Sequence, residues 1–491
     1  MKATSFNYKL FSKIQGFLLL VESFFLLLSL LVGVIYHETE SVYSFLIAII
    51  ISILLGLTGL LIGKNAPLDI GKREGSVIVT SIWVLFSLVG LIPFWISGNI
   101  PSFTDAFFET MSGFTTTGAS VLNNIESLPY SMLFWRSLIQ WIGGLGIVVI
   151  TMALLPIFGF TSMQLFAAEA PGPTKDKINP KITETAKRLF LIYIILTVSQ
   201  TLLLRIAGMN WFDSICHSFT TTATGGFSTK QASIAYYNSP AIEYITIFFM
   251  IFSGVNLSLY YFLYKLKFKK VFRNEELKYY LLILGIFTIV ITLFVIDFSA
   301  PLTLKSIEQK FRESFFMVSS VMTTTGFTSY DYMQWQPFTW IMLLILMISG
   351  ASAGSTSGGV KVVRVVLVVK FCYYEFKRMI HPNAVLPIRF NRNMVKEDTM
   401  SRVLAFALLY CIITLFGTLV LSFTGMGFIE SLSGMITCLS DVGPGMGELG
   451  PANSFATVPT FSKWFLSFIM LVGRLEIFTV LLLLTPAFWK K

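Results

Sequence analysis

The chain has 491 residues, of which 55% are hydrophobic and 13% are charged, and its formal net charge is +10. Soluble globular domains carry about 25% charged residues, so this composition excludes an ordinary soluble protein. The positive charge does not indicate a nucleic-acid partner, because the Lys and Arg residues gather in the stretches between apolar runs.

Apolar runs long enough to cross a membrane recur along the whole chain. A membrane-spanning helix needs roughly 20 apolar residues. In chain order the runs are Phe17–Tyr36, Val42–Ile62, Val77–Ile96, Ile142–Phe158, Leu189–Ile206, Ala241–Tyr264, Tyr280–Ile296, Phe338–Val369 with a break, Val403–Phe423 and Phe461–Leu484. The sequence therefore predicts an all-α polytopic membrane protein that has the lipid bilayer as its surroundings.

The positions of Lys and Arg predict which helix ends face the cytoplasm. If the runs cross in turn with the N-terminus inside, most of the 36 basic residues fall in predicted cytoplasmic stretches. These stretches are the N-terminus, 64–75, 175–188, 265–278, 361–402 and the C-terminus. Because cytoplasmic loops are enriched in Lys and Arg, we expect both termini to be cytoplasmic.

The segments predicted to be external share an unusual order. After the run Val77–Ile96, a short helical pattern at Phe103–Gly113 begins with a cap at Ser102 or Thr104. It would be roughly 16 Å long, about half a bilayer. The stretch "FTTTGAS" and a full spanning helix follow. The same order recurs roughly every 100 residues, with short helices at 211–222, 308–322 and 427–440, so we interpret it as an internal repeat.

The Thr/Gly stretches of the four repeats predict one ion pathway. Non-helical backbone at membrane depth must be buried in protein or line a wet cavity. Rings of backbone carbonyls can replace the hydration shell of K⁺, and glycine allows the positive φ that turns successive carbonyls the same way. The predicted filter residues are Thr116, Thr117 and Gly118; Thr224, Gly225 and Gly226; Thr324, Thr325 and Gly326; and Asp441, Val442 and Gly443.

Two points about this filter stay open in the sequence. The spacing does not decide whether Gly225 or Gly226 corresponds to Gly118. The fourth stretch has no threonine and carries Asp441 instead, so the ring is predicted to be chemically asymmetric, which should soften its selectivity.

The predicted fold class is therefore an all-α membrane protein with four parallel helix–pore-helix–filter–helix repeats around one pore. Two extra N-terminal transmembrane helices precede the repeats. The predicted units are 1–75 for the two extra helices, 76–186 for repeat 1, 187–278 for repeat 2, 279–401 for repeat 3 and 402–491 for repeat 4.

The second helix of repeat 3 is predicted to be broken. Small and polar residues fill Ser349–Gly359, between two strongly apolar stretches, and glycine and serine disfavour a continuous helix. We interpret this stretch as a gate loop beneath the filter, a packing face between helices being the alternative. A phosphate-binding loop is excluded, because the Gly-x₄-Gly-Lys-Ser/Thr order is absent. The residues chosen are Gly350, Gly354, Ser355, Gly358 and Gly359.

Arg474 is the one further residue assigned to the gate. It lies in an apolar run, roughly 16 Å along the helix from Lys463. A charge at membrane depth is expensive and indicates function. We expect Arg474 to contact carbonyls of the gate loop and to form an electrostatic barrier. The alternative is an ion pair with Glu476, although residues two apart do not face each other on a helix.

The four units, with "GGFST" in the second, "TTTGFT" in the third and "VGPGMG" in the fourth, resemble the Trk/Ktr/HKT superfamily of cation transporters. The two additional N-terminal helices resemble the bacterial TrkH type. The resemblance implies K⁺ uptake across the bacterial cytoplasmic (inner) membrane, K⁺ ions bound in the filter without a covalent cofactor, a homodimer, and a cytosolic TrkA-type nucleotide-binding regulatory subunit. It also implies an obstructing loop beneath the filter and a pore-facing arginine. Gly118 favours K⁺, because serine at this position accompanies Na⁺ transport in the plant branch.

Two other classes of function were weighed. A Na⁺- or H⁺-coupled secondary transporter also fits repeats and broken helices, and a Na⁺-permeable variant of the pore stays open. An intramembrane enzyme is not expected, because the sequence has no HExxH motif, no Ser/His or Asp/Asp pair on predicted facing helices, and only 3 histidines.

Overall fold

The structure, a computed structural model, describes residues 6–66, 72–144, 146, 182–297 and 303–489. This part of the chain is almost entirely helical; its two short strands, β1 (Arg389–Phe390) and β2 (Asn393–Met394), pair antiparallel. Six of the described helices are long and apolar enough to cross a membrane, and two bent helix pairs raise the number to as many as eight. The expectation of a polytopic helical membrane protein is confirmed.

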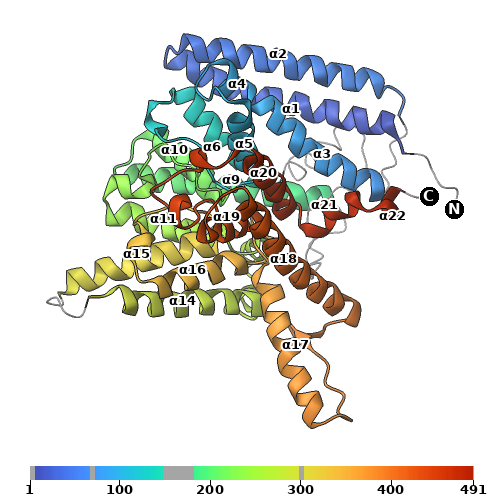
Figure 1. Ribbon diagram of the computed structural model, residues 1–491, viewed down its shortest axis with the longest axis vertical. Helices are drawn as coiled ribbons and strands as arrows, with labels where there is room; N and C mark the ends of the chain where they lie inside the picture. The colour runs from blue at the N-terminus through green and yellow to red at the C-terminus, as the bar shows by residue number, and fades with distance from the viewer. Residues whose placement is uncertain (1–5, 67–71, 145, 147–181, 298–302, 490–491) are drawn as a thin grey trace.

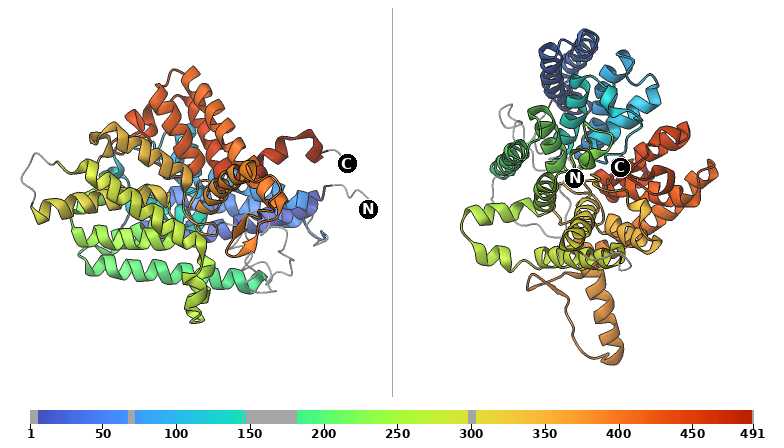
Figure 2. Two further views of the ribbon diagram at one scale, coloured as in Figure 1. Left: turned by 90° about the horizontal axis from the view of Figure 1, so that it is seen from below. Right: turned by 90° about the vertical axis from the view of Figure 1, so that its left-hand side faces the viewer.

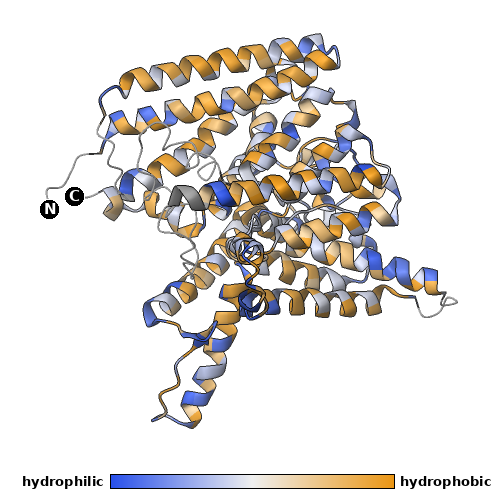
Figure 3. Ribbon diagram, turned by 180° about the vertical axis from the view of Figure 1, so that it is seen from behind, coloured by the Kyte–Doolittle hydropathy of each residue, from blue (hydrophilic) through white to orange (hydrophobic). Residues whose placement is uncertain are grey.

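Two long helices, α1 (Tyr8–Ile35) and α2 (Thr39–Ile62), pack along each other at one side of the molecule (Figure 1). Glycines allow the close approach: a Cβ on Gly16 would lie 2.5 Å from the Gly56 carbonyl oxygen. The outer face of α2 is apolar and exposed (Figure 3), and Leu54 is 58% exposed. Such a face is suited to lipid.

After α2, the described elements are grouped here into four sets, each with a long helix, a shorter helix, a 3₁₀ turn and a further helix in that order. The first set is α3 (Lys72–Gly90), α4 (Ile92–Ile96), α5 (Phe103–Phe114), η1 (Ile125–Ser127) and α6 (Tyr130–Gly144). The second is α9 (Ile182–Ile206), α10 (Trp211–Thr222), η3 (Ser233–Tyr237), α11 (Pro240–Ser253), α12 (Leu257–Tyr264) and α13 (Phe268–Phe272).

The third set is α14 (Glu275–Val295), α15 (Leu304–Met322), η4 (Tyr332–Gln334), α16 (Pro337–Ser349) and α17 (Val362–Ile380). The fourth is α18 (Glu397–Phe423), α19 (Phe428–Ser440), η5 (Gly447–Leu449), η6 (Phe455–Thr457), α20 (Thr460–Arg474), α21 (Ile477–Leu484) and α22 (Pro486–Trp489). In the right-hand view of Figure 2, the chain passes around the molecule from blue through green and yellow to red.

Side-chain caps explain where three of the four short helices begin. Ser102 accepts a hydrogen bond from the backbone N–H of Asp105 at 3.3 Å, as predicted for α5. Asn210 accepts from Asp213 at 2.7 Å, and Thr303 caps α15. The helix α15 includes one more turn than the pattern at 308–322 predicts, the exposed turn Leu304–Ile307, which begins at the Thr303 cap. The helix α19 begins after Gly427 without a side-chain cap.

For two apolar runs, the prediction of one continuous helix is wrong. Ala241–Tyr264 is divided into α11 and α12, which are bent by 94°, and Phe461–Leu484 is divided into α20 and α21, bent by 119°. The bends lie at residues 254–256 and 475–476. The predicted run Ile142–Phe158 lies outside the described residues, apart from Ile142–Gly144 and Gly146.

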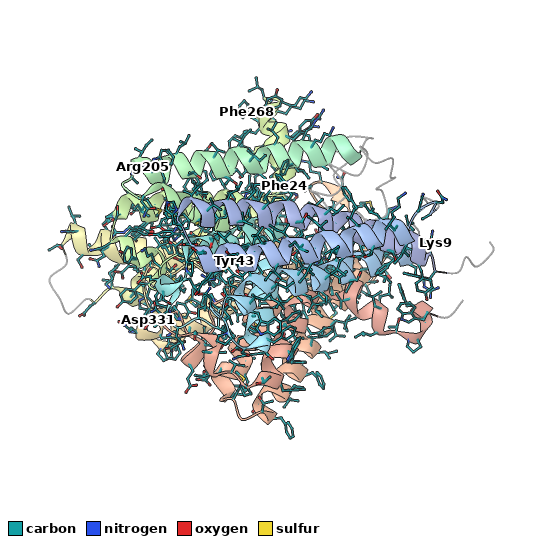
Figure 4. All side chains as sticks on the ribbon, turned by 90° about the horizontal axis from the view of Figure 1, so that it is seen from above. Lys9, Phe24, Tyr43, Arg205, Phe268 and Asp331 are labelled. Atoms are coloured by element: carbon teal, nitrogen blue, oxygen red, sulfur yellow. The ribbon has the colours of Figure 1, made fainter. Side chains whose placement is uncertain are left out.

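The labelled residues in Figure 4 show the polar ends of this helical assembly. Lys9, near the start of α1, lies at one end, and Arg205, near the end of α9, lies at the opposite end with Asp331. Phe24, which is 57% exposed, lies between them. Charged ends that flank an apolar middle are expected of helices that cross a bilayer.

Candidate functional site

Each of the four short helices α5, α10, α15 and α19 is followed, directly or after one residue, by three residues with the same backbone conformation, here called a triplet. The first and last residues of each triplet have positive φ, and the middle residue does not. The first residues are Thr116 (+59°), Thr224 (+54°), Thr324 (+56°) and Asp441 (+55°). The last residues are Gly118 (+82°), Gly226 (+76°), Gly326 (+79°) and Gly443 (+107°). Gly226, rather than Gly225, therefore corresponds to Gly118.

The end of each short helix dictates this conformation. The N–H of the middle residue donates to the carbonyl five residues earlier in the helix, as in a Schellman motif. These bonds are Thr117 to Ser112 (2.9 Å), Gly225 to Thr220 (2.9 Å), Thr325 to Ser320 (2.8 Å) and Val442 to Thr437 (2.9 Å). The motif needs a left-handed residue, which usually is glycine or asparagine. Threonine there is strained, and such strain concentrates at functional sites.

The four triplets meet in a closed ring. A Cβ built on the last glycine of each triplet would collide with, or closely approach, the carbonyl oxygen of the middle residue of the next one. The distances are 2.1 Å from Gly118 to Gly225, 1.9 Å from Gly226 to Thr325, 2.0 Å from Gly326 to Val442, and 2.8 Å from Gly443 to Thr117. The fourth triplet thus closes on the first, and only glycine fits at these contacts.

A cavity opens on one side of this ring. It encloses about 600 Å³ of empty space, including open solvent, and all four last-position glycines line it together with Arg136. Arg136 is 1% exposed and forms an ion pair with the fully buried Glu109 at 2.8 Å. Its guanidinium also donates to the Ser228 carbonyl at 3.1 Å. This pair was not singled out in the sequence, where each residue reads as an isolated charge.

Asp441 differs from the first residues of the other three triplets. Its side chain is fully buried, and the Thr117 hydroxyl donates to one carboxylate oxygen, Oδ1, at 2.8 Å. The other oxygen, Oδ2, has no hydrogen-bond partner among the described residues. The asymmetry predicted for the fourth triplet is therefore an asymmetry of charge and of hydrogen bonding.

The loop Ser349–Gly359 lies against the opposite side of the ring from the cavity. The Gly358 N–H donates to the Thr324 hydroxyl at 2.7 Å, and the Thr356 hydroxyl donates to the Thr222 carbonyl at 3.1 Å. A Cβ on Gly358 would lie 2.0 Å from the Ser440 carbonyl oxygen. The loop therefore contacts the last residue of α10, the first residue of the third triplet and the last residue of α19.

The other residues assigned to this loop shape it. Gly350, Gly354 and Gly359 have φ values of +62°, +74° and +73°. A Cβ on Gly350 would lie 2.5 Å from the Gly358 carbonyl oxygen, so the loop folds back on itself. The Ser355 hydroxyl donates to the Ser352 carbonyl at 2.6 Å and shares a hydrogen bond with the Ser357 hydroxyl at 2.8 Å. The Leu257 N–H donates to the Gly354 carbonyl at 3.0 Å, which ties the loop to the bend between α11 and α12.

Arg474 links this loop to the first set of helices. Its guanidinium donates to the Thr356 carbonyl at 2.9 Å and to the Gly144 carbonyl at 3.0 Å, and it also bonds the Gly143 carbonyl. The expected contact with loop carbonyls is present. Glu476 forms its ion pair with Arg364.

Comparisons with known proteins identify the family of this chain. The family model TrkH, described as cation transport protein, matches residues 42–491. The Trk system potassium uptake protein TrkH of Escherichia coli (strain K12) is 38% identical over 99% of this chain and 100% of its own length. The Trk system potassium uptake protein TrkI of Halomonas elongata is 32% identical over 98% of this chain and 96% of its own length.

A solved structure extends the agreement to the fold. The crystal structure of the potassium transporter TrkH from Vibrio parahaemolyticus superposes with a TM-score of 0.88 at 34% identity, covering 98% of this chain and 100% of that one. A family match over most of the chain, together with full-length relatives and a matching fold, leaves one conclusion: this multi-pass membrane protein belongs to the TrkH family of cation transport proteins.

Proposed function

We propose that this protein takes up K⁺ across the membrane through one selectivity filter to which the four triplets each contribute a quarter. The observation that carries the proposal is the closed ring, in which every last-position glycine abuts the next middle-position carbonyl. In this proposal the ring presents carbonyl oxygens from four chain segments to one cation. Carbonyl rings of this kind replace the hydration shell of K⁺.

The choice of K⁺ rests on the chemistry of the ring and on the relatives. The curated relatives are named as potassium uptake proteins, and Gly118 occupies the position where a serine would indicate Na⁺. Three triplets begin with threonine, whose hydroxyls add neutral oxygens at the inner end. In this proposal the four sets of helices are parallel repeats around one pore, and the two N-terminal helices lie outside it.

We infer that the gate loop and Arg474 close the pathway beneath the filter. The loop is hydrogen-bonded to Thr324 and Thr222, and Arg474 holds it through the Thr356 carbonyl. The guanidinium charge supplies a barrier to cations. The proposal includes the bacterial inner membrane with both termini cytoplasmic, a homodimer, and a cytosolic TrkA-type subunit that moves the loop.

Asp441 favours one alternative, a pathway that also admits or is coupled to Na⁺ or H⁺. Its carboxylate brings a formal negative charge to the ring of neutral oxygens, and one of its oxygens has no hydrogen-bond partner among the described residues. A stronger field favours smaller cations. The alternative predicts that an imposed Na⁺ or proton gradient drives uptake, whereas the filter proposal predicts that the K⁺ gradient and the membrane potential suffice.

Uptake of ⁸⁶Rb⁺ into KCl-loaded liposomes that contain the purified chain tests the proposal. We expect external K⁺ to compete strongly and Na⁺ weakly, with no dependence on an imposed Na⁺ or pH gradient. Deleting residues 350–359 should raise uptake by the chain alone. Equal competition by the two ions overturns the K⁺ filter, and a silent deletion overturns the gate.

A further inference from the structure

A buried amide on α6 reaches across to the second triplet. The side chain of Gln140 is fully buried. Its Nε2 donates to the Gly225 carbonyl at 2.7 Å, and its Oε1 accepts from the Phe227 N–H at 3.0 Å. Both ends of the amide are satisfied by backbone groups two residues apart. The amide therefore fixes the peptide groups on either side of Gly226.

The corresponding residues of the other three helices cannot make this contact. Near their C-terminal ends, α6, α11, α16 and α20 share a position with a small residue, which is Gly143, Ser253, Ser349 and Gly473. When the helices are aligned on this position, Gln140 corresponds to Met250, Leu346 and Met470. All four side chains are fully buried. Only Gln140 offers a strong hydrogen-bond donor, because methionine and leucine side chains have none.

The middle residue of each triplet differs in the complementary way. Thr325, Val442 and Thr117 carry side chains at this position, whereas Gly225 carries none. Gly225 is not among the residues with positive φ, so its backbone conformation does not require glycine. A Cβ on Gly225 would lie 2.5 Å from the amide carbon of Gln140. The glycine is required because Gln140 occupies the space that a side chain would fill.

One turn earlier on α6, Arg136 extends the same support. Its Nη1 donates to the Ser228 carbonyl at 3.1 Å, and its guanidinium lies over the Phe227 ring at 4.2 Å from the centroid. Residues four apart lie on one face of a helix. One face of α6 therefore holds the second segment from Gly225 to Ser228 through polar contacts.

From these contacts we propose that Gln140 is a positioning residue, which sets the orientation of one of the ring carbonyls and thereby the cation preference of the pathway. The inference rests on the proposed function. The Gly225 oxygen is the one that Gly118 abuts, so it belongs to the ring. A carbonyl that accepts a hydrogen bond from a side chain rotates less, and part of its electron density is directed to the donor. Both effects change how well the carbonyl replaces water around a cation.

A double-variant cycle tests the pairing of Gln140 with Gly225. The variants are Q140M, G225T and Q140M/G225T, the last of which copies the pair Met250 and Thr325. In the ⁸⁶Rb⁺ assay, the readout is the ratio of the Na⁺ and K⁺ concentrations that halve uptake. A purely structural role would change the amount of folded protein and leave this ratio unchanged.

We expect Q140M to take up ⁸⁶Rb⁺ with the ratio lowered roughly fivefold, the size expected for the loss of one hydrogen bond between neutral groups. G225T should lose uptake, because its side chain meets Gln140, and Q140M/G225T should regain it. M250L, at the equivalent depth in α11, is the matched control and should keep the wild-type ratio. A wild-type ratio in Q140M, or a double variant no better than G225T, overturns the proposal.

Two measurements keep this test separate from that of the proposed function. Wild-type protein without K⁺-selective uptake would overturn the proposed function, whereas selective wild-type protein with an equally selective Q140M overturns only the role of Gln140. If Q140M does not fold, the comparison of G225T with the double variant still decides. The unfolding temperatures of wild type and the three variants in detergent test the same pairing. If the change in the double variant differs from the sum of the two single changes, the pairing is supported; if it equals that sum, the pairing is contradicted.

Discussion

The backbone N–H of Gly358 donates to the hydroxyl of Thr324 at 2.7 Å. Gly358 is buried within the gate loop, and Thr324 is the first, strained residue of the third triplet, with φ of +56°. One hydrogen bond therefore joins the loop to the ring. A displacement of the loop would have to break this hydrogen bond or pull on the third triplet.

Replacing Thr324 with valine should loosen the gate loop. Valine keeps the shape of threonine but leaves the Gly358 N–H buried without an acceptor, at a cost of about 1–3 kcal/mol. We expect ⁸⁶Rb⁺ uptake by the chain alone to rise roughly tenfold. Thr324→Ser keeps the oxygen and should retain the wild-type rate. Equal uptake by Thr324→Val and wild type contradicts the coupling.

Arg474→Met should also raise uptake in the absence of any partner. The substitution removes the bonds from the guanidinium to Thr356, Gly143 and Gly144 and removes the positive charge. Hydrogen bonds from charged groups contribute about 1.5–3 kcal/mol each, so a rise of roughly tenfold or more is expected. Arg474→Lys should be intermediate, because an ammonium cannot reproduce the planar fork. If Arg474→Met lowers uptake at equal protein amounts, the barrier is refuted.

Gly118→Ser should abolish K⁺ preference through a collision and not through backbone strain alone. Its Cβ would lie 2.1 Å from the Gly225 oxygen at φ of +82°. Gly98→Ala provides the control, since Gly98 has φ of +73° and nothing within 4 Å of its Cβ position. Both variants incur about 1–2 kcal/mol of left-handed strain. Competition assays should show lost preference only in Gly118→Ser; the same loss in both would implicate strain instead.

Asp441→Asn should have opposite effects on stability and on transport. The buried Oδ2 has no hydrogen-bond partner among the described residues, and a buried charge costs more than a buried neutral amide, so Asp441→Asn should raise the temperature of unfolding. Asparagine also tolerates the left-handed conformation. Loss of the charge should weaken cation attraction, and the K⁺ concentration for half-maximal uptake should rise several-fold. Thermal unfolding checks the effect on stability, and uptake kinetics check the effect on transport. If the K⁺ concentration for half-maximal uptake is unchanged, Asp441 does not act on the transported cation.

Local signals in the sequence were sufficient to predict the short helices and the break at Ser349–Gly359. The predicted boundaries of the second short helix, 211–222, are those of α10, and Ser102 is the cap expected for α5. The break at Ser349–Gly359 follows from glycine and serine, which end α16 at Ser349. Each of these features depends on neighbours in the chain.

Features that depend on contacts distant in sequence could not be read in this way. The run Ala241–Tyr264 is mostly apolar, and the short stretch Ser253–Asn256 does not by itself predict a break. Its bend is held by bonds from Leu257 to Gly354 and from Ser352 to Gly254. Gly225 and Gly226 are indistinguishable until the backbone angles and the amide of Gln140 separate them. Gln140 itself resembles an ordinary polar residue in a helix.

The contact of Gly443 with Thr117 has a consequence for biosynthesis. The ring closes between the first and the last triplets, which are separated by most of the chain. Before α19 is synthesised, the nascent protein has only three of the four triplets and therefore no complete ring. In the proposed pathway, ion conduction therefore requires nearly complete translation, and interrupted synthesis leaves an incomplete ring in the membrane.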